Sequence, residues 1–297
     1  MSNDERNFRS AYYEKVGFKS VEEKRSLEML LKEGVLDPNK LKQFCLRFSV
    51  PHVYRSFVWK ILLDVIPKQV HCQDFIMKQR KQEYDDLHQT LVITDVIDEK
   101  TPQDEILLYM WLIKSDNFTF DSNIKDTTES CCFTAIVDFL LHCFDDEVDV
   151  YWIASRFYDN ISVIRQDMTK LIECTHSLLE RDDYDLYRHL AQINVLDNLP
   201  LQIWFNRCFA GVINEDCLAK IWDKICGGCY KILAFLVFAL FTTLRHHILR
   251  VNNINSIFSL ITNVPKDTAD IIVNNCIDKW QNSGSPLTVH DKPKTTT

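Results

Sequence analysis

The sequence predicts an all-α globular protein, and three observations support this fold class. Of its 297 residues, 46% are apolar and 26% are charged, which is the balance of a chain with a hydrophobic core. It has only 6 Gly and 8 Pro, well below the roughly 7% and 5% of average proteins, so the residues that form tight turns in all-β folds are scarce. Apolar residues also recur at helical spacing along most of the chain.

Start and stop signals predict three helices before residue 68. A Ser with a Glu three residues later is a capping box, and an Asp followed by Pro is an N-cap with the first helical residue. Gly and Pro end helices. These signals stand at Ser20 with Glu23, at Asp37 with Pro38, at Pro51, at Gly34 and at Pro67. We expect residues 1–49 to form N-terminal helices that pack on a main domain of residues 50–281.

The same signals predict a helix-rich remainder. A long charged helix is expected at 71–91, and Thr101 with Pro102 starts the next one. Residues 114–130 are rich in Asp, Asn, Ser and Thr, which predicts a long surface loop. Further helices are expected at 133–144, 148–161, 168–179, 184–193, 200–210, 215–225, 230–249, 254–262 and 267–280. Residues 282–297 are polar and are expected to form a disordered tail.

Charge, cysteine content and hydropathy narrow the partners and the compartment. The 34 basic and 42 acidic residues give a formal net charge of −8, so the chain lacks the positive field of a nucleic-acid binder. Eleven Cys without a secretion-type leader indicate reduced thiols in the cytosol. The longest apolar run, residues 232–241, is shorter than the roughly 20 residues of a membrane span. We therefore expect a core helix there and no direct membrane insertion.

The sequence patterns that could indicate a catalytic, redox or metal site are weak. Cys226 and Cys229 have the spacing of a redox pair or of half a zinc site, but no second ligand pair accompanies them, so buried structural thiols are the preferred interpretation. Acidic clusters at 145–147 and 182–185 stand at helix boundaries, where carboxylates cap free N–H groups. The sequence has no phosphate-binding glycine loop, nucleophile elbow or zincin motif. No cofactor and no metal are predicted.

Residues 106–113, Ile-Leu-Leu-Tyr-Met-Trp-Leu-Ile, are apolar on every face of the predicted helix. Such a helix must be surrounded by protein. Two interpretations stay open: the helix is central in the core, or part of it contacts a partner, because Trp, Tyr and Met are enriched at interface centres. Under the second interpretation the partner-binding residues are Leu107, Leu108, Met110 and Trp111.

Several motifs, in order and spacing, resemble the TBC domain. They are the segment from Arg55 to Leu62, Tyr151-Trp152-Ile153, residues 186–190, residues 200–210, and Lys220-Ile-Trp-Asp223. The resemblance covers roughly residues 50–280. It implies an all-helical fold that usually accelerates GTP hydrolysis by Rab GTPases. Its fold signature corresponds here to Arg55, Trp59, Trp152, Trp204, Trp222 and Asp223, which are expected to serve as scaffolding and not as reacting groups.

Active members of this family supply an Arg in an Ile-x-x-Asp-x-x-Arg pattern and a Gln in Tyr-x-Gln to the GTPase. The best match to the first pattern starts at Val92 and places Asp98 where the Arg stands. Counting back from the Tyr-Trp motif places Thr134 near the second, and no Gln occurs between Gln103 and Gln166. A carboxylate adds repulsion where phosphoryl transfer requires a cation. The resemblance therefore implies a TBC domain without the catalytic fingers.

Arg80, Arg55 and Lys100 are the candidate substitutes for the missing Arg. Arg55 belongs to the fold signature, and Lys100 lacks the bidentate fork of a guanidinium. Losing both fingers costs several kcal/mol of barrier lowering, and the sequence shows no replacement. The favoured hypothesis is a protein that is not an enzyme.

The segments 6–10, 12–18, 101–103, 149–153 and 207–211 resemble one branch of the family in particular, the small third subunit of the tuberous sclerosis complex. This resemblance implies a scaffold that binds the coiled coil of hamartin and, through it, tuberin, the GTPase-activating protein of Rheb that restrains mTOR complex 1. It implies a cytoplasmic protein recruited to the lysosomal surface or vesicles by its partners. The alternatives are an active Rab GTPase-activating protein and a Rab effector that binds without accelerating hydrolysis.

Overall fold

The computed structural model describes residues 21–120 and 122–291. Within these ranges the chain is built from helices, and its only β pairing is an isolated bridge between Val35 and Gln69. The all-α prediction is confirmed. Residues 1–20 lie outside the described residues, and so does the capping residue expected at Ser20.

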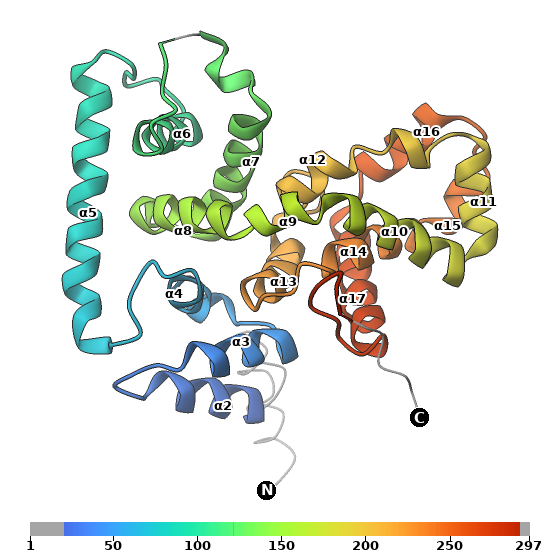
Figure 1. Cartoon of the computed structure of the whole chain (residues 1–297), viewed down its shortest axis with the longest axis horizontal. Coiled ribbons are helices and arrows are strands. Elements are labelled where there is room, and N and C mark those ends of the chain that lie inside the picture. The colour runs from blue at the N-terminus through green and yellow to red at the C-terminus, as the bar shows by residue number, and fades with distance from the viewer. Residues whose placement is uncertain (1–20, 121, 292–297) are drawn as a thin grey trace, which may run out of the picture.

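Three short helices form the N-terminal layer: α2 (Val21–Leu31), α3 (Pro38–Arg47) and α4 (His52–Leu62). The Asp37 carboxylate accepts hydrogen bonds from the backbone N–H groups of Asn39 at 2.9 Å and Lys40 at 3.4 Å, so the N-cap predicted for α3 is confirmed. In Figure 1 these helices cover the lower end of the molecule.

The next part of the chain folds around one central helix. Figure 1 shows α6 end-on, with α5 along the outer edge, α7 on the opposite side and α8 below. These helices are α5 (Val70–Ile93), α6 (Gln103–Lys114), α7 (Thr128–Cys143) and α8 (Glu147–Asn160). The short 3₁₀ helix η1 (Ser122–Asp126) lies between α6 and α7.

The C-terminal part packs around α14, whose residues 232–241 are all buried. Helices α10 and α17 both pack against it. None of the described helices is both long enough and apolar enough to cross a bilayer. The elements are α9 (Ser162–Gln166), α10 (Met168–Asp182), α11 (Tyr184–Gln192), η2 (Leu196–Asn198), α12 (Leu201–Asn206), α13 (Glu215–Cys226), α14 (Ile232–Thr243), α15 (Arg245–Ile248), α16 (Ile254–Thr262) and α17 (Lys266–Asn282).

Three predicted boundaries are corrected by local backbone chemistry. Helix α7 begins at Thr128, inside the expected loop, because Thr127 caps it by accepting from the N–H of Ser130 at 3.1 Å. Helix α12 ends at Asn206, because Cys208 and Phe209 adopt φ of 48° and 65° in the left-handed region. The helix expected at 230–249 is divided at residue 244 into α14 and α15.

The tail is not disordered where the structure describes it. The carbonyl of Leu287 accepts from the N–H groups of Tyr230 and Lys231, both at 3.0 Å. The carbonyl of Pro286 accepts from the indole N–H of Trp280 at 2.9 Å. Residues 283–291 therefore pack back on the start of α14 and the end of α17, which corrects the prediction of a disordered segment from residue 282. The last six residues lie outside the described range.

Candidate functional site

Four of the predicted signature residues meet around the buried carboxylate of Asp223. Its Oδ1 accepts from the guanidinium Nε of Arg55 at 3.1 Å and from the indole N–H of Trp59 at 3.0 Å. Its Oδ2 accepts from the backbone N–H of Val50 at 2.9 Å. The ring of Trp222 lies 6.0 Å from that of Trp59. Through these hydrogen bonds the carboxylate connects the start of α4 to α13. It is buried and is not accessible to a ligand.

The other two signature tryptophans lie in separate parts of the core. The indole N–H of Trp152 donates to the carbonyl of Arg80 at 3.0 Å, which ties α8 to α5. Trp204 is buried on α12, where its ring lies 5.6 Å from that of Phe209. Together the signature residues hold helix pairs in place.

Asp98, which the motif match predicts at the position of the family's Arg, lies exposed in the connection between α5 and α6. Its carboxylate accepts from the N–H of Lys100 at 2.9 Å and from the hydroxyl of Thr101 at 3.0 Å. These two hydrogen bonds, in that order, lower the pKa of Asp98. The side chain is therefore an anion that shapes the turn before α6.

Thr134, which the sequence predicts near the position of the family's Gln, lines an open groove of about 410 Å³ between α6 and α7. Three carboxylates and one ammonium are among its lining residues. Lys125, the ammonium, pairs with Glu105. The lining residues are Asp104, Glu105, Leu108, Lys125, Cys131, Thr134, Ala135 and Asp138.

The three cations considered as substitutes are placed differently. Arg55 is bound to Asp223 in the interior. Arg80 stacks its guanidinium 4.1 Å from the ring centre of Trp152 and lies 3.8 Å from the carboxylate of Glu83. Lys100 is exposed in the turn that Asp98 caps. Of these cations, only Lys100 lies beside the expected Arg position.

The predicted partner-binding residues of α6 are corrected by their burial. The exposed fractions are 0% for Leu107 and Met110, 2% for Leu108 and 8% for Trp111. Trp111 stacks on Phe133 of α7 with ring centres 4.4 Å apart. Because α5, α7 and α8 surround α6, these side chains form the core, and the hypothesis that they contact a partner is wrong.

The cysteine pair and the acidic clusters are structural. Cys226 and Cys229 are buried, and burial raises the pKa of Cys229 to about 12, which disfavours a thiolate. Among the described residues no three His, Cys, Asp or Glu side chains are grouped to hold a metal ion. The carboxylates of Asp146 and Asp183 cap α8 and α11, so the capping interpretation is confirmed.

The outer face of α5 is a surface that sequence reasoning missed. Phe75 and Ile93 are 63% and 71% exposed. They are 18 residues apart, which is five helical turns, so both lie on one face about 27 Å apart. Exposed residues continue this face at spacings of four and three, and the four between Phe75 and Ile93 are polar. The α5 seam consists of Phe75, Gln79, Gln82, Asp86, Gln89 and Ile93. A search for apolar periodicity does not detect this surface, because the four seam residues between Phe75 and Ile93 are polar.

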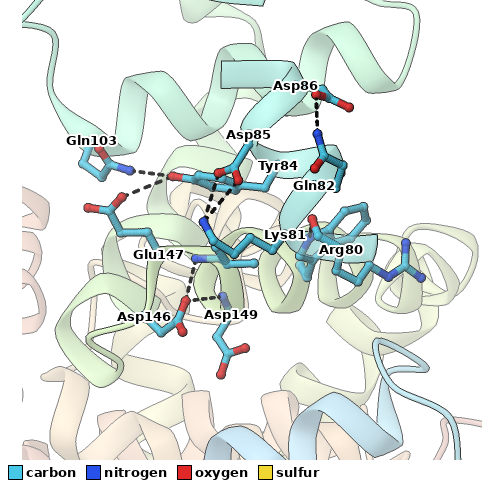
Figure 2. A network of polar contacts seen from close by, with 12 residues as sticks. Arg80, Lys81, Gln82, Tyr84, Asp85, Asp86, Gln103, Asp146, Glu147 and Asp149 are labelled. Atoms are coloured by element: carbon cyan, nitrogen blue, oxygen red, sulfur yellow. Dashed lines mark hydrogen bonds and ion pairs between the residues drawn. The ribbon is translucent and has the colours of Figure 1, made fainter. Parts of the chain in front are cut away.

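The inner face of α5 is held by polar contacts, shown in Figure 2. The hydroxyl of Tyr84 donates to Glu147 of α8 at 3.2 Å and accepts from the amide of Gln103 of α6 at 3.3 Å. The Tyr84 and Tyr151 rings contact edge to face at 5.8 Å. Because three helices meet at one phenol, α5 is fixed in place while its seam faces outward.

Comparisons with known proteins agree with this architecture. The Rab-GTPase-TBC domain family matches residues 133–249. TBC1 domain family member 7 of Homo sapiens is 36% identical over 96% of this chain and 98% of its own length, and that of Xenopus tropicalis is 36% identical over 94% and 96%. The solved Ypt/Rab-GAP domain of Gyp1p has a TM-score of 0.60 at 16% identity, covering 88% of this chain and 98% of that one. A Chlamydomonas flagellar RabGAP TBC domain has a TM-score of 0.55 at 15% identity, covering 81% and 84%.

Proposed function

Because the chain belongs to the TBC domain family, with full-length relatives among the TBC1 domain family member 7 proteins, we propose that it is a non-catalytic scaffold of that family. Its partner is the coiled coil of hamartin, and through hamartin it supports the activation of Rheb GTP hydrolysis by tuberin and the restraint of mTOR complex 1. These partners also bring it to the lysosomal surface. The observation that carries the proposal is the chemistry at the two finger positions, Asp98 and Thr134.

Electrostatics support the loss of catalysis. An active finger places a guanidinium against the transferring phosphoryl group, which contributes about 10³ to 10⁵ in rate. Asp98 instead offers a carboxylate whose turn hydrogen bonds favour the charged form. The groove beside Thr134 carries Asp104, Glu105 and Asp138 against Lys125 alone. The negative charge of this surface repels a nucleoside triphosphate.

The α5 seam is the surface we propose for the partner, in place of the buried residues of α6. The seam extends about 27 Å along α5, a helix of 24 residues and about 36 Å, and a coiled-coil helix can pack along it. Phe75 and Ile93 supply apolar contacts at its two ends. The polar residues between them select the register of the partner, as polar seam positions do in coiled coils.

The first experiment measures single-turnover GTP hydrolysis by a panel of Rab GTPases, with and without the protein, beside a TBC protein that retains both fingers. We expect the active protein to accelerate hydrolysis by orders of magnitude and this chain to leave the intrinsic rate unchanged. A large acceleration of any Rab would establish the second candidate function, an active Rab GTPase-activating protein, which the shared fold with Rab-GAP domains favours. A GTP-dependent pull-down in the same panel detects a Rab effector.

The second experiment measures capture of the hamartin coiled coil by variants of the seam. Phe75→Asp and Ile93→Asp place charges on exposed positions, so both variants should fold and lose at least tenfold in affinity. Ile271→Asp is the matched control, because Ile271 is 52% exposed on α17, away from α5. If both seam variants bind hamartin like the control, the proposed surface is wrong.

A further inference from the structure

A second cavity, of about 370 Å³, opens where the start of α7 meets the end of α8, α9 and the end of α12. None of its lining residues belongs to the α5 seam or lines the groove between α6 and α7. They are Thr128, Glu129, Cys132, Tyr158, Arg165 and Asn206.

Two arginines at this cavity form no close ion pair, although Arg165 is near enough to Asp159 to oppose the rise that burial causes in the pKa of that carboxyl. The guanidinium of Arg165 lies 4.4 Å from the ring centre of Tyr158, and Arg207 directly follows the lining residue Asn206. Neither arginine forms an ion pair with any residue of the ranges 21–120 and 122–291. Burial raises the pKa of the Cys132 thiol, and Arg207 is close enough to oppose that rise, which places its charge beside the cavity wall.

Hydrogen-bonding groups here are also unsatisfied. The Nε of Arg207 and the Oδ1 of Asn206 are buried, and neither has a hydrogen-bond partner among the described residues. Buried polar atoms are nearly always paired in folded proteins, so two adjacent exceptions need an explanation. The Asn206 amide can turn to present either its oxygen or its NH₂ group. A ligand in the cavity would satisfy both residues.

The backbone adds positive potential. Helix α7 has 16 residues and begins at Thr128, and the first N–H groups of a helix favour bound anions. Thr128 also offers a hydroxyl, and Glu129 is the one carboxylate among the lining residues. Among the lining residues, Arg165 stands against Glu129, and the charge of Arg207 beside Cys132 adds a second cation next to the wall. The nearby carboxyl of Asp159 faces Arg156 as well as Arg165, so the three guanidinium groups outnumber the two carboxylates around this cavity.

From these observations we infer that the cavity is a binding site for a phosphomonoester group. Arg165 provides a planar fork for two phosphate oxygens. Arg207, Asn206 and Thr128 provide further donors, which suits the three oxygens of a phosphate better than the two of a carboxylate. The site does not depend on the hamartin surface, because its residues lie on α7, α8, α9 and the end of α12.

The test follows thermal unfolding of the full chain while sodium phosphate replaces sodium chloride at constant ionic strength. Phosphate stabilises most proteins weakly and without saturation, whereas a specific site gives a melting shift that saturates. We expect a saturating shift for the wild type, its loss in Arg165→Gln, and its retention in Arg188→Gln. Arg188 is a matched control, because its side chain is 60% exposed on α11.

Glu129→Gln supplies a prediction of opposite sign. Removing the one carboxylate of the lining should lower the half-saturating phosphate concentration several-fold, an effect that a purely structural role of these residues would not produce. The inference is overturned if no saturating shift occurs, or if Arg165→Gln and Glu129→Gln both saturate like the wild type. A labelled phosphoserine peptide, compared with its serine form, distinguishes the sources: tighter binding than inorganic phosphate indicates a phosphorylated chain, and equal binding indicates free phosphate.

Discussion

At the scale of single residues, the fold depends on buried charged side chains that are paired with opposite charges in the interior. Asp223 accepts from Arg55, Trp59 and the N–H of Val50 without exposure to solvent. Burial alone would lower the pKa of Arg55, but the charge and hydrogen bond of Asp223 outweigh it and raise that pKa. The Arg55 guanidinium therefore stays charged, and its burial depends on the contact with Asp223.

Asp223→Ala should lower the free energy of unfolding by about 3–5 kcal/mol, because it leaves the Arg55 guanidinium buried without an anion. Urea unfolding followed by circular dichroism measures the loss. Asp278→Ala, an exposed Asp on α17, is the control and should change stability by less than about 0.5 kcal/mol. Equal effects of the two substitutions would contradict the role assigned to Asp223.

Asp182 gives the expected response to acid. Hydrogen bonds from Arg181 at 2.8 Å and then Lys279 lower the pKa of its carboxyl from 3.8 to about 2, against the opposing effect of burial. A carboxyl with a lowered pKa in the folded state stabilises the protein above its unfolded value of 3.8, and this contribution disappears as the pH falls towards 2. Asp182→Asn should therefore weaken the loss of melting temperature between pH 4 and pH 2. An unchanged acid profile in this variant would show that the carboxyl is not paired.

At the scale of elements, α6 shows where sequence reasoning reaches its limit. A helix that is apolar on every face can be surrounded by its own protein, or it can leave one face for a partner. The periodicity of apolar residues does not distinguish these two arrangements. Packing decides: Trp111 stacks on Phe133, and Tyr158 lies edge-on to Trp111 at 5.1 Å. Only the three-dimensional arrangement shows that residues 106–112 are buried among α5, α7 and α8.

The substitutions Leu108→Asp and Trp111→Asp should therefore each destabilise the whole protein. Each substitution buries an unpaired carboxylate in place of a packed side chain, and a loss above about 4 kcal/mol is expected. Far-ultraviolet circular dichroism should show a lower melting temperature or an unfolded chain. If the variants melt like the wild type and only lose a partner, α6 is a binding surface after all.

The sequence specifies helices better than it specifies their ends and their surroundings. Asp37, Asp146 and Asp183 are caps recognisable from local sequence, and the structure confirms them. The division of the helix at residue 244 and the packing of 283–291 could not be read in this way, because distant elements decide them. The α5 seam was missed for a related reason, since exposure at its two ends is a property of the assembled fold.

At the scale of the whole molecule, the N-terminal helices expected to pack on the main domain make contacts with its interior. The ammonium group of Lys224 donates to the carbonyls of Cys45 at 2.6 Å and Phe48 at 2.7 Å. Leu41 and Cys45 of α3 are fully buried against the rest of the core. The first helices therefore complete the interior of the TBC domain.

A chain that lacks residues 1–49 should not fold stably, because Lys224 loses both acceptors and the core loses α3. Thermal unfolding of this chain, beside the full chain, measures the effect. Leu41→Ala provides a graded comparison with an expected loss of about 2–5 kcal/mol. A truncated chain with the melting temperature of the full protein would instead establish residues 50–281 as an independent domain.

The shared carboxylate of Asp223 also sets the order of events during synthesis. The ribosome delivers Val50, Arg55 and Trp59 long before Asp223, which follows Val50 by 173 positions. Contacts between such distant segments form late. While the nascent chain grows, water solvates the Arg55 guanidinium and the Trp59 indole, and their shared acceptor arrives only when α13 has been synthesised.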